Sequence, residues 1–272
     1  MKIPAADPGY LDVVVPEVTV PSGEETQVCL YYTHDGPDVA VVGLDGIQSE
    51  FGHHVVVLKP KTPKPSGTVE DCSSGTSMGE FNTFVLPVSE LPAKHAIRMV
   101  SGMNVVIQAH TLNVGNRDIL VRDVARLKLM AVDQVEQWAT TFATGSIDFS
   151  LPPKQTSAVE FDCTVNEDMD LLFVGGHMHY LGSRFQLSWG ADADSLEPFY
   201  LADPWLPDYR DIPPVTLLFN NPMKLTKGTV IRTLCEWKNP EATVVQFPQE
   251  MCGSFGYVRG ATEAFNCEAT SK

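Results

Sequence analysis

Apolar residues along this chain fall in short runs that are rich in β-branched and aromatic side chains and are broken by Gly, Pro, Asn and Asp. Such runs predict β-strands, and no segment predicts an amphipathic helix longer than about two turns. Many short strands joined by tight turns are typical of sandwiches and barrels, so we expect an all-β protein. The expected strands include LDVVVPEVTV, TQVCLYYT, HHVVVLK, MNVVIQAHTLN, ILVRDVARLKLMAV, AVEFDCTV, DLLFVGGHMHYL, RFQLSWG, VTLLFN, GTVIRTLCEW and SFGYVRG.

The length of 272 residues suits two domains of ordinary size. A boundary is indicated within 127–146, where a strand ends and polar residues come before the next series of strands at IDFSLPPKQ. We therefore expect two antiparallel, jelly-roll-like β-sandwiches in tandem, over 1–130 and 131–272. The two halves show no internal sequence repeat.

The charge balance excludes several classes of partner. With 19 basic and 34 acidic residues the net charge is −15, which repels phosphate backbones and anionic headgroups. We expect no nucleic-acid partner, and no membrane span, because no apolar run approaches the ~20 residues that a membrane helix needs. Residues 1–15 contain neither an apolar segment nor a small-residue cleavage site, so we expect the signal segment to be absent from this chain. We also expect a monomer.

The chain has 6 cysteines and no CxxC motif, which weakens zinc-ribbon and thioredoxin interpretations. Disulfides are favoured, and they would place the protein in an oxidising, extracytoplasmic compartment, secreted or periplasmic. Six buried thiols in a cytosolic protein are the alternative that spacing alone leaves open.

Two of the 7 histidines stand one residue apart in LLFVGGHMHYLG. Residues i and i+2 of a strand share a face, so His177 and His179 would point the same way, with Met178 opposite. Two imidazoles on one face can bind one metal ion. The alternative for such a pair is two half-buried strand residues with local hydrogen bonds.

Three more histidines lie at the start or end of apolar strands. Because adjacent strand residues point to opposite faces, His53 and His54 can serve one metal only at a strand end, bulge or twist, which Gly52 would permit. His110 lies late in VVIQAHTLN and needs a polar partner there, for which a carbonyl would suffice. The two remaining histidines lie in polar, turn-like surroundings and are expected to be solvated: His34 and His95.

Taken together, the HH pair, the later single histidine and the HxH motif resemble the copper type II, ascorbate-dependent monooxygenases. That family uses a methionine ligand within a Glu-Met-Cys tripeptide, and FPQEMCGSF supplies Glu250, Met251 and Cys252 in the corresponding region. The preceding KGTVIRTLCEWKN is similar to the family's Thr-x-Cys segment. The resemblance covers roughly residues 25–267, and it implies disulfides Cys29–Cys72, Cys235–Cys252 and Cys163–Cys267.

The resemblance further implies two copper ions per chain, facing each other across an interdomain cleft. One site would have only nitrogen ligands and would transfer electrons. The other would include a soft thioether ligand, which favours Cu(I), and would bind O2 and hydroxylate a substrate C–H bond. Ascorbate would supply the electrons. The implied ligands are His53, His54 and His110 for the first site, and His177, His179 and Met251 for the second.

The chain departs from the family at the substrate. The peptide-amidating members hold a substrate carboxylate with an arginine two positions before the HxH, and with two further residues after the ligand methionine. Here those positions are Gly175, Gly253 and Phe255, and glycine cannot replace a bidentate arginine. We therefore expect no amidation of glycine-extended peptides, and a neutral or cationic small molecule or modified peptide as substrate.

Two alternatives remain from the sequence. The first is a copper-binding or copper-sensing protein that keeps the ligands and has no catalytic activity. The second is a cupin-like or zinc enzyme, which is disfavoured because HMHYLGSRFQ lacks the glutamate that normally follows a cupin HxH.

Overall fold

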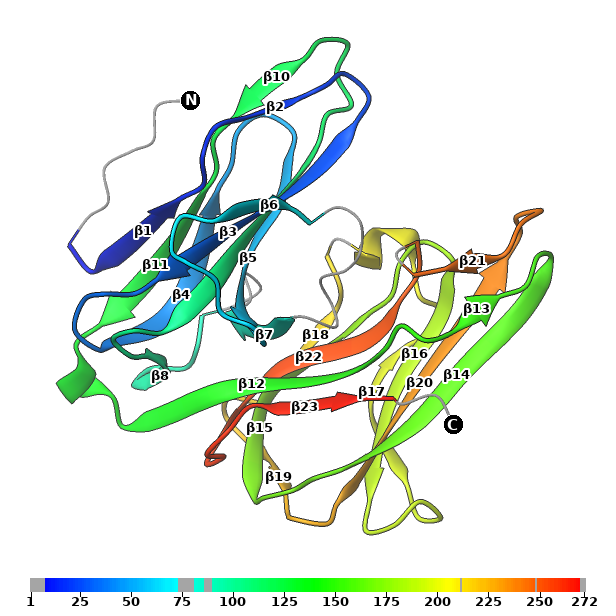
Figure 1. The fold of residues 1–272 in the computed structure, drawn as a ribbon. Coiled ribbons are helices and arrows are strands. Elements are labelled where there is room, and N and C mark those ends of the chain that lie inside the picture. The colour runs from blue at the N-terminus through cyan, green and yellow to red at the C-terminus, as the bar shows by residue number, and fades with distance from the viewer. Residues whose placement is uncertain (1–7, 73–80, 86–89, 211, 248, 270–272) are drawn as a thin grey trace. The chain divides into compact units, whose positions relative to one another are not determined.

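The computed structural model describes residues 8–72, 81–85, 90–210, 212–247 and 249–269, with the backbone alone for 81–85. The protein is all-β and belongs to the β-sandwich class, as the sequence predicts (Figure 1). In the described chain the helical elements are two short 3₁₀ turns, η1 at Val132–Gln134 and η2 at Pro207–Arg210. No helix of this part is long and apolar enough to cross a membrane.

The chain divides into two compact units, Met1–Trp138 and Ala139–Lys272. The expected domain limits of 1–130 and 131–272 remain a prediction. One expectation near this boundary is wrong: Gln137–Ser146 forms a ten-residue strand, β12, in place of a polar connection. Its threonines look polar in a composition count, but they are β-branched, and Thr141 and Thr144 are themselves buried.

The first unit contains two antiparallel sheets and a two-stranded ribbon. One sheet has the order β1-β11-β4-β8, namely Tyr10–Val14, Val124–Met130, Val39–Ile47 and His95–Met99. The other has the order β6-β3-β9-β5-β7, namely Val69–Asp71, Glu25–Thr33, Asn104–Leu112, Gly52–Pro60 and Phe81–Val85. The ribbon pairs β2 and β10, namely Val18–Val20 and Ile119–Val121.

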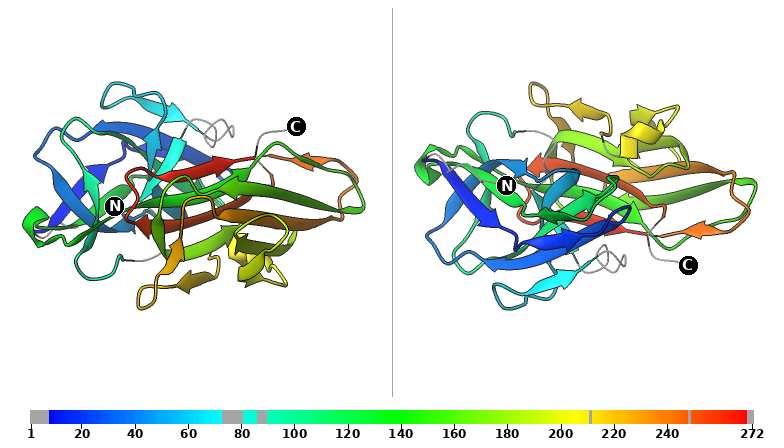
Figure 2. Two further views of the ribbon diagram at one scale, coloured as in Figure 1. Left: turned by 90° about the horizontal axis from the view of Figure 1, so that it is seen from below. Right: turned by 90° about the horizontal axis from the view of Figure 1, so that it is seen from above.

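The second unit contains two sheets and a ribbon of its own, which Figure 2 shows from two further directions. One sheet runs β12-β22-β15-β18, where the last three are Cys252–Arg259, Met169–His177 and Val215–Leu217. Two short strands extend it: β19 and β23, at Met223–Leu225 and Phe265–Glu268. The other sheet runs β14-β20-β16-β17, at Gln155–Thr164, Val230–Asn239, Gly182–Gly190 and Glu197–Ala202. The ribbon pairs β13 and β21, namely Ser150–Leu151 and Val245–Gln246.

The two units repeat one topology, although their sequences show no repeat. Strands β1, β11, β4 and β8 pair as β12, β22, β15 and β18 do, and β3, β9, β5 and β7 pair as β14, β20, β16 and β17 do. The ribbons correspond as well. The eight corresponding strands of each unit can be numbered 1 to 8 in chain order. In both units they then form one sheet of order 1-8-3-6 and one of order 2-7-4-5, which is the strand order of a jelly roll.

A buried asparagine closes the same corner in each unit. The Asn113 amide donates to three carbonyls, those of Val20, Pro21 and Arg117, at 2.9–3.0 Å, and its oxygen accepts the Gly115 N–H. The Asn239 amide likewise donates to three carbonyls at 2.9–3.1 Å, and its oxygen accepts the N–H two residues later. Those partners are the carbonyls of Leu151, Pro152 and Thr243 and the N–H of Glu241. The repeated unit thus includes this polar contact.

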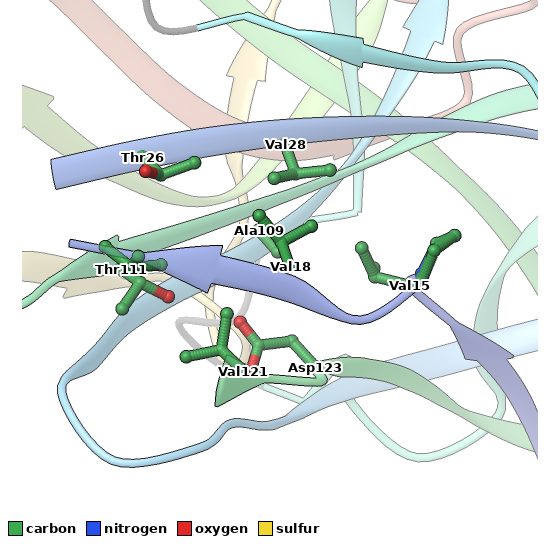
Figure 3. Close-up of a pocket in the computed structure, with 10 residues that line it drawn as sticks. Val15, Val18, Thr26, Val28, Ala109, Thr111, Val121 and Asp123 are labelled. Carbon is green, nitrogen blue, oxygen red and sulfur yellow. The ribbon is translucent and has the colours of Figure 1, made fainter. Parts of the chain in front are cut away.

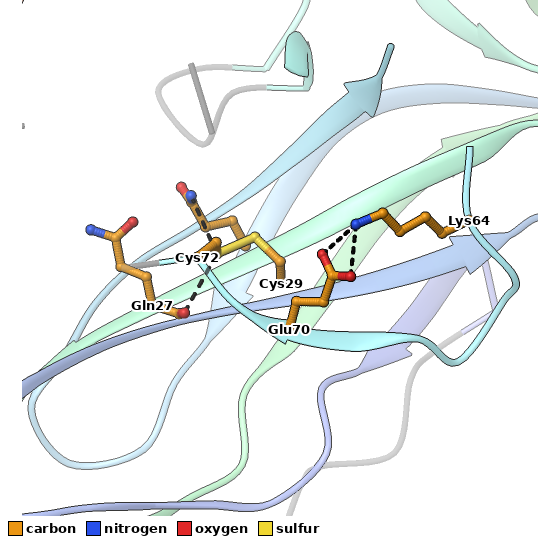
Figure 4. Close-up of a disulfide and its surroundings, with 6 residues drawn as sticks. Gln27, Cys29, Lys64, Glu70 and Cys72 are labelled. Atoms are coloured by element: carbon orange, nitrogen blue, oxygen red, sulfur yellow. Dashed lines mark hydrogen bonds and ion pairs between the residues drawn. A yellow bond between two sulfur atoms is a disulfide. The ribbon is translucent and has the colours of Figure 1, made fainter. Parts of the chain in front are cut away.

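All six cysteines form disulfides, and the three bridges join the partners that the resemblance implies: Cys29–Cys72, Cys163–Cys267 and Cys235–Cys252. The first, shown in Figure 4, fixes the segment after β6 to β3. The Cys72 N–H also donates to the Gln27 carbonyl at 2.9 Å. Each of the other two joins one sheet of the second unit to the other. Three disulfides indicate an oxidising, extracytoplasmic environment.

We expect Asn113→Asp and Asn239→Asp each to lower the free energy of unfolding by about 3 kcal/mol, because each turns an oxygen toward three buried carbonyls. The measurement is urea denaturation of the oxidised protein. Asn266→Asp, at an exposed position of β23, is the matched control. Losses no larger than that of the control would show that the corner contact does not stabilise the fold.

Candidate metal centres

Three histidines meet on one face of the second sheet of the first unit. His54 on β5 and His110 on β9 are directly paired, so their side chains lie on the same face. The ring centroids of His53, His54 and His110 are 5.0 Å apart in every pair. One ligand nitrogen from each lies within 4.8 Å of the others. Two nitrogens on one ion are separated by at most about 4 Å, so small ring rotations suffice to bind a metal.

A β-bulge solves the problem of two adjacent histidines on one face. The register shifts between Gly52 and His54, because Gly52 pairs with Thr111 and His54 with His110, which leaves His53 as the extra residue. Of the strand end, bulge or twist that the sequence allowed, the structure has the bulge. A Cβ at position 52 would lie 2.3 Å from Gln48 Cβ, so glycine is needed for close approach as well as for the bulge.

Gln48 and Asp123 support this face from behind. The Gln48 amide donates to the His110 carbonyl at 3.1 Å and to the buried Asp123 carboxylate at 3.2 Å. A small cavity lies on the far side of β9, lined in part by Ala109, Thr111 and Asp123 (Figure 3). Because Ala109 and Thr111 alternate with His110 along the strand, this cavity lies on the opposite face from the histidines.

The HxH motif lies at the end of β15 in the second unit. Met178 is fully buried in the sandwich core, whereas His177 and His179 are half-buried, as the alternation predicts. The two rings lie with their centroids 5.3 Å apart and nearly perpendicular. The motif therefore presents both imidazoles away from the core of its own sandwich.

The register of β22 brings Met251 to this pair. His177 pairs with Gly253 at the end of both strands; His179 follows His177 by two residues and Met251 precedes Gly253 by two. The Met251 methyl carbon lies 3.7 Å from where a Cβ at Gly253 would be, which puts its side chain on the same face as His177. The Met251 side chain therefore lies beside the position that pairs with His177, and glycine at position 253 adds no side chain there.

Glu250 holds the HxH turn through its carboxylate, which is fully buried. Its two oxygens accept the His179 N–H at 3.0 Å, the Leu181 N–H at 2.6 Å and the Trp237 indole N–H at 2.9 Å. Burial raises the pKa of Glu250, and these hydrogen bonds oppose that rise because they favour the charged form. One acid therefore ties together the HxH turn, β20 and the segment that carries Met251.

The His179 ring is oriented by a backbone carbonyl. Its Nδ1–H donates to the Gln249 carbonyl at 2.9 Å, which leaves Nε2 for a metal. The Trp205 indole N–H donates to the His179 carbonyl at 3.1 Å. The residue is thus fixed at its amide, carbonyl and ring, as is typical of a metal-ligating histidine.

The first unit uses the same support as the second. Asp123 lies just before β11, and its carboxylate accepts the N–H of Ser49 at 3.0 Å. Ser49 lies two residues beyond the end of β4. In the second unit Glu250 lies two residues before β22, the strand that corresponds to β11, and its carboxylate accepts the N–H of His179. His179 lies two residues beyond the end of β15, the strand that corresponds to β4. Sequence reasoning missed Asp123 and Gln48, because no local motif distinguishes them from other polar residues.

One of the two remaining histidines differs from expectation. His34 was expected to be solvated, but it is buried, and its Nε2–H donates to the Pro37 carbonyl at 2.7 Å. The turn that follows folds back over the ring, which the polar sequence HDGPD conceals. His95 is half-buried and bonds the Ala93 carbonyl at 3.1 Å. Neither joins the two clusters.

Comparisons with known proteins assign no family to this chain. No family model matches it, and no curated protein matches it. The two clusters are therefore interpreted from their own residues and from the resemblance of their motifs.

We expect Glu250→Gln to lower the free energy of unfolding by about 1–3 kcal/mol, because the new amide group faces at least one N–H donor. A raised pKa means that the folded state binds a proton more tightly, so the stability from Glu250 is greatest in acid. This contribution to stability declines as pH rises from 4.5, the ordinary pKa of a glutamate, through the raised pKa of Glu250 in the folded state. The gap between wild type and variant should therefore narrow from pH 4 to pH 7.

The measurement is urea denaturation at several pH values, with exposed Glu241→Gln as control. A gap that widens with pH would contradict the assigned direction of the pKa shift.

Proposed function

We propose that this protein is a copper-dependent monooxygenase that hydroxylates a C–H bond of a small molecule or peptide, using O2 and ascorbate. The observation that carries the proposal is the presence of two ligand clusters of different chemistry, one in each unit. The first offers three imidazoles from β5 and β9, and the second offers two imidazoles and a thioether beside β15 and β22. Each side chain is placed by a bulge, a register or a hydrogen bond.

The donor sets suit two different tasks. Imidazole suits both Cu(II) and Cu(I), so His53, His54 and His110 fit an electron-transfer site. A thioether favours Cu(I), so Met251 fits the site that activates O2. Bound copper would supply one-electron redox chemistry and O2 activation. The overall balance is R–H + O2 + 2 e⁻ + 2 H⁺ → R–OH + H2O, with ascorbate as the two-electron donor.

The surroundings of the second cluster favour an apolar substrate. A Cβ at Gly175 would lie 2.6 Å from Phe255 Cζ and 3.1 Å from Val215 Cγ1, so those side chains fill the space beside β15. Gly175 pairs with Val215 and Phe173 with Leu217, which puts both β18 residues on the face that carries His177. Leu217 is 56% exposed. This surface suits an uncharged group, so we propose that the protein does not amidate glycine-extended peptides.

Two candidate cations for a substrate carboxylate are already engaged. Arg184 lies on β16 in the other sheet, and its guanidinium donates to Gln186 at 2.6 Å and lies 3.7 Å from Asp203. Arg259 on β22 is paired with Asp170 at 3.0 Å. Both arginines are therefore better explained as structural ion pairs than as a substrate clamp.

The disulfides support function outside the cytosol, and we propose a secreted or periplasmic monomer without a nucleic-acid partner. The same ligand clusters also fit a copper-binding or copper-sensing protein without catalytic activity. The two functions differ in one measurable property, since the enzyme alone couples ascorbate oxidation to hydroxylated product.

We expect the reconstituted protein to bind two copper ions per chain. Met251→Ala should weaken Cu(I) binding at one of the two sites, because it removes a direct ligand. Loss of a residue that only supports a ligand typically weakens metal binding by about 10–100-fold, so the effect here should be at least that large. The measurements are copper stoichiometry, Cu(I) competition and Cu(II) EPR, with Met223→Ala on β19 as the control. Binding of one copper ion or none, or unchanged copper binding in Met251→Ala, would contradict the assignment of two sites. Binding of two copper ions without product formation would favour the copper-sensing protein.

We expect ascorbate-dependent hydroxylation of ethylbenzene to exceed that of 4-ethylbenzoate by about tenfold or more, because an unpaired carboxylate would be desolvated on the apolar surface. Leu217→Lys should shrink this preference. Leu201→Lys, at a 54% exposed position of β17 in the other sheet, should not. Product is measured by gas chromatography. A preference for the carboxylate in the wild type would contradict the proposed substrate class.

A further inference from the structure

An acidic side chain approaches the three-histidine cluster from β3. Gln27 is paired with His110 and Glu25 with Leu112, so Glu25 lies diagonally across from His110 on the same face of the sheet. A Glu25 carboxylate oxygen lies 3.4 Å from His110 Nε2. No sequence motif marks Glu25, which is one of two consecutive glutamates at the start of the strand.

The separation of 3.4 Å is informative. A charge-assisted hydrogen bond between an imidazole and a carboxylate is about 2.7–2.9 Å long. Two donors that bind one ion at about 2.0–2.2 Å are separated by about 2.8–3.1 Å at a right angle and by about 3.4 Å at a tetrahedral angle. The observed distance is longer than a direct hydrogen bond, and it puts the Glu25 carboxylate within reach of an ion held by His110 Nε2.

The exposure of the two side chains also favours this role. The His110 side chain is 6% exposed and that of Glu25 is 58% exposed, so the carboxylate reaches the cluster from the solvent side. Within the described residues His110 is the one ion-pair partner of Glu25. Glu25 lies outside the set of three histidines whose ligand nitrogens are all within 4.8 Å of one another, and an exposed glutamate can reach an ion bound there by a change of rotamer that leaves the core undisturbed.

We propose that Glu25 is the fourth donor of the first centre, an oxygen ligand beside His53, His54 and His110. The inference rests on the proposed function, because it requires that this centre binds copper. A carboxylate is a harder donor than imidazole and adds one negative charge, so it favours Cu(II) over Cu(I). The first centre would then have a lower reduction potential than the thioether centre, which suits an electron donor.

The test compares Glu25→Gln with the matched control Glu24→Gln in the full, oxidised, copper-loaded chain. Glu24 lies one residue earlier and is exposed, so its variant removes the same charge without removing the donor. Glu25→Gln should weaken Cu(II) binding at the first centre by about tenfold, with Cu(I) binding retained. Its reduction potential should rise by about 59 mV for that factor, and its Cu(II) EPR parameters should change.

Each outcome has a distinct meaning. If Cu(II) binds the wild type and Glu25→Gln behaves like Glu24→Gln in affinity, potential and EPR, the fourth-donor assignment is overturned while the proposed function stands. If the first centre binds no copper in the wild type, both are overturned. Thermal unfolding of the apo variants checks that the exposed substitutions leave the fold intact.

Discussion

A buried carboxylate that accepts main-chain N–H groups is the contact on which the second cluster depends. Glu250 is fully buried and receives three N–H donors, and two of these come from the HxH turn itself. Its neighbour Met251 is thereby fixed relative to His179. A buried acid is costly unless its hydrogen bonds are made, so this carboxylate and this turn require each other. In the first unit Asp123 holds the turn after β4 in the same way.

The repeated topology explains why the two clusters arise in different places. Both units have the same eight-stranded order, yet the first carries histidines on β5 and β9 and the second carries its ligands at β15 and β22. The scaffold provides equivalent supports, while different strands carry the ligands. Two donor sets of unlike softness can therefore be built on one architecture without any repeat in the sequence.

Much of this could be predicted from the sequence, because strand alternation is a strong local signal. It predicted the all-β class, a Met178 side chain opposite those of His177 and His179, and the need for a strand end, bulge or twist at His53, since each depends on the period of two. The strand β12 and the burial of His34 could not be predicted in that way. Threonine-rich strands look polar in composition, and a histidine can be buried by a turn whose residues are themselves polar.

Long-range contacts account for the remaining differences. Gln48 donates to the His110 carbonyl and to the Asp123 carboxylate across 62 and 75 residues of sequence, and no periodicity reports such contacts. Glu25 is the clearest case, because only the register of β3 against β9 brings it to His110. A sequence motif identifies ligands that are close together in the chain. The charge and hardness of the whole ligand set also depend on side chains that the neighbouring strand contributes. The difference between the two centres therefore arises from sheet register as much as from the histidine and methionine motifs.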